Sequence, residues 1–332
     1  MPLDGRSHIR RVLCLSGGGF RGVFSARILS KFEESIGEPA ADRFDLVVGT
    51  STGAIIGAAL ALRIPAKDIE AAYLESGPQI FQPRWIPFDY PGKQFLGNWA
   101  RLFISSPYSA VRIRKAIRLI VGDENARASL KELNIPLAVI ALSHTEGRAR
   151  LFGSGIFAED FPNISLEDAL VASASAPTYF PSLLLNSESL VDGGLVANAP
   201  ELVAIWVAIS KFGVDLANLR ILGIGTASPD NGQAVRRRDN RGILAWLLSK
   251  RGLIQLTIGA QERLARDITA GLLGDNYRLI DWAPSAAQGS AFGEMDNTRE
   301  QAGETLQGLG EIAWNEFVKH ERNRSFIGEL LK

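Results

Sequence analysis

A serine between two glycines is the residue of this sequence best suited to act as a nucleophile. It lies in Gly49-Thr50-Ser51-Thr52-Gly53, which follows an apolar segment and precedes a run of small residues. In a strand-turn-helix context the flanking glycines allow a tight turn that projects the hydroxyl from the sheet edge. The following helix directs its N-terminal dipole and free N–H groups at the same point. The pattern predicts Ser51 as a nucleophile, and a chance match in an α/β turn is the alternative.

A glycine loop near the start of the chain offers main-chain donors. It reads Gly17-Gly18-Gly19-Phe20-Arg21-Gly22 and follows the apolar segment 12–15. The spacing matches the dinucleotide fingerprint, but the acidic residue expected after the second strand is missing, because that strand ends in Gly49-Thr50-Ser51. Exposed N–H groups of such a loop can instead stabilise an oxyanion, at about 3–4 kcal/mol per donor. A nucleotide-binding module that uses residues 17–22 remains the alternative.

The serine also needs a proton acceptor. Asp192-Gly193-Gly194 follows an apolar strand end, and an aspartate shielded from water has a pKa raised towards the working range. The histidines lie in contexts typical of surface residues; they are His8, His144 and His320. The chain order Ser51, Asp192, His320 nevertheless leaves a Ser-His-Asp α/β-hydrolase or esterase as a second hypothesis.

These three segments, in this order, resemble the patatin-like phospholipase family. Ala174–Phe180 and Ile224–Thr226 resemble it too, and the resemblance runs from about Val12 to Thr226. It implies a Ser-Asp dyad hydrolase with Ser51 as nucleophile and Asp192 as proton acceptor. The implied oxyanion hole consists of main-chain amides of Gly18, Gly19 and Phe20. The residues implied to support these motifs are Gly17, Arg21, Gly22, Gly49, Gly53, Gly193 and Gly194.

The resemblance also implies an activity. It is phospholipase A-type hydrolysis of membrane phospholipid acyl esters through an acyl-enzyme, with no cofactor and no metal. The segment 15–22 is similar to the start of bacterial patatin-like effectors of antiphage systems, which implies a cyclic nucleotide as activator. One departure is Ser16, where many family members have an aspartate.

The composition limits the partners. Of 332 residues, 46% are apolar and 22% charged, and Lys+Arg and Asp+Glu both number 36, so no net charge attracts a nucleic acid polymer. The single cysteine, Cys14, cannot form an intramolecular disulfide and fits a reducing compartment. No secretory signal is visible, and the apolar stretch 46–62 is interpreted as a strand and a helix rather than a membrane span. We expect a cytoplasmic protein that attaches to the inner face of the membrane when active.

Strands and helices alternate along the chain. This order predicts an α/β fold with a central, mostly parallel sheet between helices. We expect one domain over 1–332, with a catalytic core of about 10–230 and a helical C-terminal elaboration of about 240–332. The expected strands are 12–15, 44–48, 136–142, 150–152, 190–191, 219–224 and 277–282. The expected helices are 23–34, 52–62, 112–121, 166–173, 200–212, 242–273, with a break near Gly252, and 300–321.

Three further segments have more than one interpretation. The aromatic-rich residues 77–108 are expected to form a cap or lid, which either binds acyl chains or simply packs on the domain. Arg236-Arg237-Arg238 either meets lipid or nucleotide phosphates or lies in a solvated loop. The segment 243–256 fits a bilayer surface, core packing or a homodimer interface.

Overall fold

The computed structural model describes residues 11–82, 106–130, 133, 135–154, 161, 163–228, 253–292 and 295–332. Its strands are β1 (Arg11–Leu15), β2 (Leu46–Thr50), β3 (Leu137–Ser143), β4 (Arg148–Gly153), β5 (Leu183–Leu185), β6 (Glu188–Asp192), β7 (Arg220–Ile224) and β8 (Tyr277–Ile280). Its helices are α1 (Gly22–Ile36), α2 (Thr52–Ala61), α3 (Ala66–Ile80), α5 (Ala110–Val121), α6 (Asp123–Arg127), α7 (Leu166–Ala174), α8 (Gly194–Ala197), α9 (Glu201–Phe212), α11 (Leu253–Leu273), α12 (Ala286–Phe292), α13 (Glu300–Lys319) and α14 (Glu321–Leu330).

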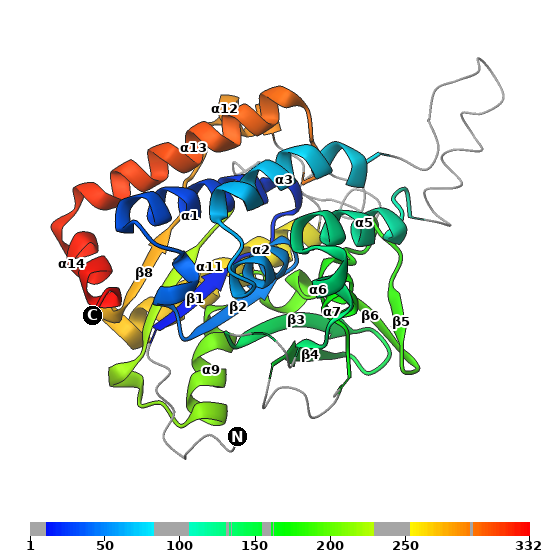
Figure 1. Cartoon of the computed structure of the whole chain (residues 1–332), viewed down its shortest axis with the longest axis horizontal. Coiled ribbons are helices and arrows are strands. Elements are labelled where there is room, and N and C mark those ends of the chain that lie inside the picture. Colours follow the sequence, from blue (N-terminus) through cyan, green and yellow to red (C-terminus); the bar gives the residue numbers. More distant parts are fainter. Residues whose placement is uncertain are drawn as a thin grey trace, which may run out of the picture.

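The described strands form one mixed sheet. Its order is β5-β6-β3-β2-β1-β7-β8, with β4 paired to β3 outside this path. The central neighbours β3, β2, β1, β7 and β8 run parallel, whereas β4, β5 and β6 pair antiparallel. Helices cover both faces: α1, α3 and α13 lie on one side of the sheet, and α11 passes behind it (Figure 1). The mostly parallel sheet between helices that the sequence predicts is confirmed.

Alternating side chains of the central strands build two separate cores. In β1, Leu13 and Leu15 belong to the core beneath α1 and α13, whereas Val12 and Cys14 belong to the core beneath α9. Successive side chains of a strand point to opposite faces, so a strand buried on both sides reads as a continuous apolar run. This double burial explains why β1 and β2 carry almost no polar residues ahead of their C-terminal ends.

Several elements differ from the sequence predictions. α3 (Ala66–Ile80) was not predicted, and it continues past Gly77, where the cap was expected to begin. Pro78 near its C-terminus removes one backbone donor without ending the helix. The helix predicted over 300–321 corresponds to α13, which ends at Lys319, and α14, which follows from Glu321 to Leu330, was not predicted.

The three segments with open interpretations lie largely beyond the described residues. Residues 83–105 of the expected cap, the arginine run 236–238 and residues 243–252 fall outside them. Among the helices that are described, none combines the length and the apolar character needed to cross a bilayer.

Candidate active site

The register of β3 brings Ser51 and Asp192 together. Thr50, the last residue of β2, pairs with Ile140 of β3, and Asp192, the last residue of β6, pairs with the next residue, Ala141. Ser51 follows Thr50 directly, so its side chain lies beside the aspartate. The Ser51 hydroxyl donates a hydrogen bond to Oδ2 of Asp192 at 2.7 Å. Both side chains are largely buried, at 9% and 7% exposure.

Ser51 has the backbone conformation of a nucleophile elbow. Its φ of 54° and ψ of −122° lie in a region that residues other than glycine rarely adopt, and such strain persists only where surrounding contacts impose it. The Ser51 N–H donates to Oγ of Ser173 at 2.8 Å, and that hydroxyl donates to the Ile140 carbonyl at 2.5 Å. A Cβ on Gly53 would lie 2.1 Å from the Leu15 carbonyl oxygen, so only glycine fits there.

Asp192 sits in a desolvated but hydrogen-bonded position. Its Oδ1 accepts the Gly194 N–H at 2.6 Å, while Oδ2 accepts the Ser51 hydroxyl. Burial raises the pKa of Asp192 to about 6, and the two hydrogen bonds act in the opposite direction. The turn that follows Asp192 is tight, because a Cβ on Gly193 would lie 2.2 Å from the Ile140 carbonyl oxygen. A carboxylate with this pKa can accept a proton near neutral pH.

Contacts to two carbonyls orient the glycine loop. The Gly17 carbonyl accepts hydrogen bonds from Nδ2 of Asn198 at 3.3 Å and from Oγ1 of Thr226 at 3.2 Å. The Gly18 carbonyl accepts the N–H and Nε of Arg21, at 3.2 and 3.3 Å. In a planar trans peptide the N–H points away from its carbonyl, so these bonds also set the directions of the next amides, those of Gly18 and Gly19. Within the described part of the chain, neither amide has a main-chain or side-chain acceptor.

The third predicted oxyanion donor is already engaged. The Phe20 N–H donates to the Met295 carbonyl at 2.8 Å. Gly19, at φ +59°, packs directly against the same residue, because a Cβ there would lie 2.6 Å from the Met295 oxygen. Of the three amides assigned to the oxyanion hole from the sequence, the structure therefore leaves those of Gly18 and Gly19 available and directs that of Phe20 elsewhere.

The remaining residues of the two motifs have packing roles. Arg21 is buried, which lowers the pKa of its guanidinium, and its side chain reaches back to the Gly18 carbonyl rather than to open solvent. Gly22 lies against α2, where a Cβ would come within 2.4 Å of Oγ1 of Thr52. Gly49 also lies against α2, where a Cβ would come 2.7 Å from the Ala54 backbone.

An apolar pocket opens beside the dyad. α3 contributes Tyr73, Gly77 and Ile80, and α5 also contributes three residues, each three or four positions from the next. The complete lining is Gly19, Phe20, Ser51, Thr52, Ile55, Tyr73, Gly77, Ile80, Phe81, Ile113, Ala116, Ile120, Ala174, Ala176, Tyr179, Phe180, Asp192 and Met295. Such a lining suits a hydrocarbon chain whose carbonyl end reaches Ser51.

The histidines are placed away from this pocket. His144 lies exposed in the turn between β3 and β4, and His320 lies exposed between α13 and α14. Neither contributes to the pocket lining, and His8 is outside the described residues. The described residues also contain no cluster of three or more side chains that could hold a metal ion.

The sequence did not single out several residues that support the site. Ser173 and Asn198 hold the nucleophile turn and the glycine loop, and Met295 contacts Phe20 from a segment almost 300 residues along the chain. Ser173 and Asn198 lie within ten residues of predicted motifs, and this proximity in the sequence was the signal that could have identified them. Met295 has no such signal, because it contacts Phe20 through its main-chain carbonyl, which every residue type has.

Comparison with known proteins places these segments in a wider group. A family model described as patatin-like phospholipase matches residues 13–205. A cGAMP-activated phospholipase of Pseudomonas aeruginosa is 30% identical over 311 residues, which is 91% of this chain and 87% of that protein. A cUMP-AMP-activated phospholipase of Escherichia coli is 27% identical, covering 95% of each chain. Patatin-like protein 1 of Oryza sativa subsp. indica is 29% identical, covering 90% of this chain and 80% of that protein.

Proposed function

Because this chain belongs to the patatin-like phospholipase family, we propose that it cleaves acyl esters of membrane phospholipids through an acyl-enzyme on Ser51, with Asp192 as the base. The observation that carries this assignment is the 2.7 Å hydrogen bond from the Ser51 hydroxyl to Oδ2 of Asp192. A serine hydroxyl is a poor nucleophile unless a neighbouring group accepts its proton. Among the described residues, the other titratable side chains that line the pocket are the phenols of Tyr73 and Tyr179.

The chemistry divides into two steps. Asp192 takes the hydroxyl proton while Oγ of Ser51 attacks the ester carbonyl carbon, and the carbonyl oxygen becomes an oxyanion facing the amides of Gly18 and Gly19. Collapse of this intermediate breaks the bond to the lysophospholipid oxygen, which takes the proton from Asp192. Water then attacks the acyl-enzyme and gives a proton to Asp192, and release of the fatty acid returns that proton to Ser51.

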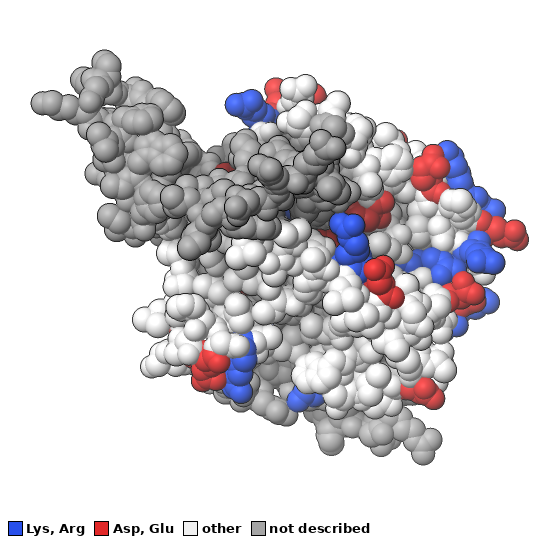
Figure 2. Space-filling model, turned by 180° about the vertical axis from the view of Figure 1, so that it is seen from behind, with Lys and Arg blue, Asp and Glu red and all other residues white. Residues whose placement is uncertain are grey.

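Two apolar regions support a lipid substrate presented by a membrane. The pocket between α3 and α5 suits the acyl chain. Leu253, Ile254 and Leu256, at the start of α11, are 41–51% exposed, one to two turns before Gln261, which contacts Asn198 of the site. Figure 2 shows charges of both signs on the rear face, mainly towards one side, around a largely uncharged middle. We propose that these exposed apolar residues contact the bilayer.

A cyclic nucleotide is proposed as the activator. The support is the description of two relatives as cGAMP-activated and cUMP-AMP-activated phospholipases, at 30% and 27% identity over most of the chain. The contact of Met295 with Phe20 and Gly19 adds a structural reason, because a segment that packs on the glycine loop can alter it by moving.

The test compares wild type with Ser51→Ala and Asp192→Asn on phospholipid vesicles, with mass-spectrometric detection of released fatty acid. Loss of at least about a thousandfold in turnover is expected for Ser51→Ala, as for other serine nucleophiles. Ser210→Ala, an exposed helical serine on α9, is the matched control. Equal turnover by wild type and Ser51→Ala would rule out the assignment. Each protein is assayed with and without cGAMP and cUMP-AMP, and high activity that neither nucleotide changes would contradict the proposed switch.

A further inference from the structure

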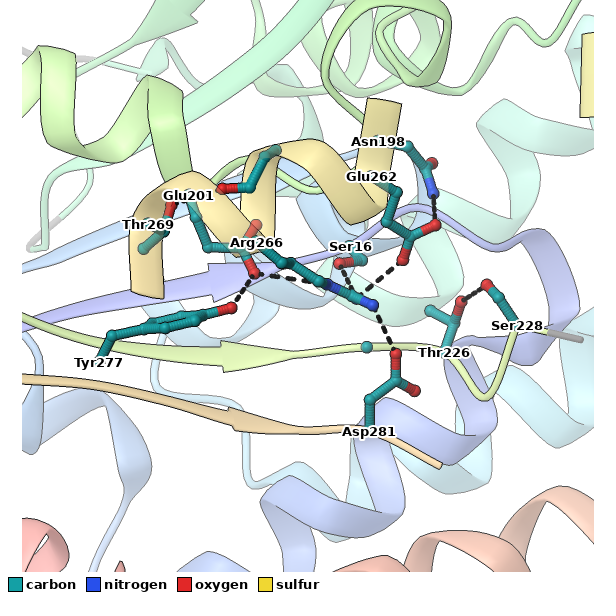
Figure 3. A network of polar contacts seen from close by, with 12 residues as sticks. Ser16, Asn198, Glu201, Thr226, Ser228, Glu262, Arg266, Thr269, Tyr277 and Asp281 are labelled. Carbon is teal, nitrogen blue, oxygen red and sulfur yellow. Dashed lines mark hydrogen bonds and ion pairs between the residues drawn. The ribbon is translucent and has the colours of Figure 1, made fainter. Parts of the chain in front are cut away.

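A buried arginine on α11 lies at the centre of a polar network behind the glycine loop. Arg266 forms ion pairs with Glu262 and Asp281, each at 2.8 Å, and donates to Oγ of Ser16 at 3.2 Å (Figure 3). Its side chain is only 15% exposed. Arg266 lies beyond residues 13–205, so the family model does not include it. Nothing in the two-step chemistry above uses this residue, although Ser16 directly precedes the glycine loop.

Three routes lead from Arg266 to Gly17. The shortest is the hydrogen bond to Ser16, whose own N–H is fixed to the Ile224 carbonyl at 3.1 Å. The second passes through Glu262, whose Oε2 accepts Nδ2 of Asn198 at 3.2 Å, while the same nitrogen donates to the Gly17 carbonyl.

The third route passes through Asp281. Its Oδ1 accepts the Ala227 N–H at 2.9 Å, and the carboxylate leaves no room for a side chain on Gly225. These contacts hold the segment after β7, from which Thr226 donates to the Gly17 carbonyl. All three routes therefore end on the peptide whose orientation sets the direction of the Gly18 amide.

Arg266 also balances charge in this buried region. Three carboxyl groups, those of Glu201, Glu262 and Asp281, lie within 4 Å of its guanidinium. Burial raises the pKa of Glu201, and Tyr277 donates a hydrogen bond to it at 3.1 Å. Burial lowers the pKa of the Arg21 guanidinium, and the Glu262 and Asp281 carboxylates act on it in the opposite direction. Without Arg266 the remaining carboxylates would be poorly compensated and would oppose negative charge on a nearby oxyanion.

We propose that Arg266 is a positioning residue for the oxyanion hole, which orients the Gly17–Gly18 peptide through Ser16, Glu262 and Asp281. It acts through these neighbours and does not touch the substrate. The inference rests on the proposed function, because it requires the amides of the glycine loop to receive the oxyanion. A residue of α11, which the family model does not cover, would thus help to position an active site whose dyad and glycine loop lie in the first 200 residues.

The test uses Arg266→Gln, Ser16→Ala and the double variant, with Asp267→Asn on the exposed side of α11 as control. Rates are expressed per active site, titrated with a fluorophosphonate that labels Ser51, so that unfolded protein does not count. For Arg266→Gln we expect kcat to fall about 10- to 100-fold with KM within about twofold. A misdirected oxyanion donor weakens stabilisation of the transition state but leaves binding of the substrate in the ground state unchanged. For Ser16→Ala, which keeps both ion pairs, we expect a fall of about 3- to 10-fold.

The double variant shows whether the two residues act as a unit. If Arg266 acts partly through Ser16, the double variant should be no slower than Arg266→Gln, whereas independent effects would multiply. A trifluoromethyl ketone, which binds as a tetrahedral oxyanion, should lose affinity in parallel with kcat. If Arg266→Gln does not fold, Glu262→Ala serves in its place, because it removes the acceptor of Asn198 Nδ2 and leaves the contact between Arg266 and Ser16.

The outcomes separate this inference from the proposed function. An unchanged kcat per titrated site in Arg266→Gln, a change confined to KM, or multiplying effects in the double variant would overturn the inference alone. The proposed function fails on a different result, namely full turnover by Ser51→Ala.

Discussion

At the scale of single residues, the environment of Asp192 predicts how activity depends on pH. Burial raises its pKa from 3.8 to about 6, and only the ionised carboxylate can take the Ser51 proton. We expect kcat/KM on a soluble, uncharged ester to be constant above pH 7 and to fall about tenfold per pH unit below pH 6. The measurement is a profile from pH 4.5 to 9, and a midpoint near pH 4 would show that Asp192 is not desolvated as described.

The same profile tests the alternative base. His320 is exposed between α13 and α14 and does not line the pocket, so His320→Ala should keep both the rate and the acidic midpoint of wild type. A large loss of kcat/KM in this variant would favour the Ser-His-Asp hypothesis.

Asp192 also predicts a conflict between activity and stability. Its pKa is higher in the folded than in the unfolded state, so the folded protein binds the proton more tightly, and the free energy of unfolding falls as the pH rises from about 3.8 to about 6. The gap between 3.8 and about 6 corresponds to about 3 kcal/mol of unfolding free energy at pH 8. Asp192→Asn should therefore be inactive but more stable than wild type at pH 8.

Urea unfolding at several pH values measures this difference. The advantage of Asp192→Asn should shrink as the pH falls and vanish below about pH 4, where Asp192 is protonated in both states. Ser51→Ala provides the control, since it removes the hydroxyl and leaves the carboxyl group in place. A variant that is less stable than wild type at pH 8 would indicate that the hydrogen bonds to Gly194 and Ser51 outweigh desolvation.

At the scale of secondary structure elements, α3 and α5 line the pocket that we propose holds the acyl chain. The α5 residues that line the pocket are Ile113, Ala116 and Ile120, which span about 10 Å along a helix. Ala116 is the smallest of them and lies midway, so Ala116→Phe should block the inner part of the pocket. We expect kcat/KM for long-chain esters to fall at least about tenfold while acetyl and butyryl esters are little affected, since a buried pocket loses affinity for each excluded methylene.

A series of p-nitrophenyl esters of increasing length measures this effect. Val111→Phe is the control on the same helix, because Val111 is 73% exposed and lies outside the pocket. An equal loss for short and long esters in Ala116→Phe would mean that the pocket does not hold the acyl chain.

Comparison of particular elements shows how far the sequence could predict this structure. The turn at Ser51, the strand that ends at Asp192 and the glycine loop were recognisable, because each has a local pattern of glycines after an apolar strand. The local patterns alone did not show that Ser51 and Asp192 lie together, and only the family resemblance implied it. The two residues are 141 apart in the chain and meet because β3 pairs with both β2 and β6. α3 was missed because the proline and aromatic residues after it suggested a loop.

At the scale of the whole molecule, the C-terminal third is an integral part of the sheet and of the large core. β8 pairs with β7 in the same sheet, and α13 packs on α1. Met295 contacts the glycine loop, and Arg266 contacts Ser16 directly before it. The buried residues that α13 places against the large core are Leu306, Leu309, Ala313, Trp314 and Phe317. The predicted core of about 10–230 would therefore lack β8, which forms one edge of the sheet, and α13, which covers α1.

This arrangement predicts that the first 228 residues do not fold by themselves. Truncation after Ser228 would expose Phe24 and Phe32 of α1, which are fully buried beneath α13, and each such aromatic contributes about 1.5–3 kcal/mol when buried. Since domains of this size are stable by only about 5–15 kcal/mol, we expect the fragment to be insoluble and inactive. The full chain should unfold in urea in one transition, with the same midpoint by far-UV circular dichroism and by tryptophan fluorescence. A soluble fragment with wild-type turnover, or two separate transitions in the full chain, would show instead that residues 1–228 are an independent catalytic domain.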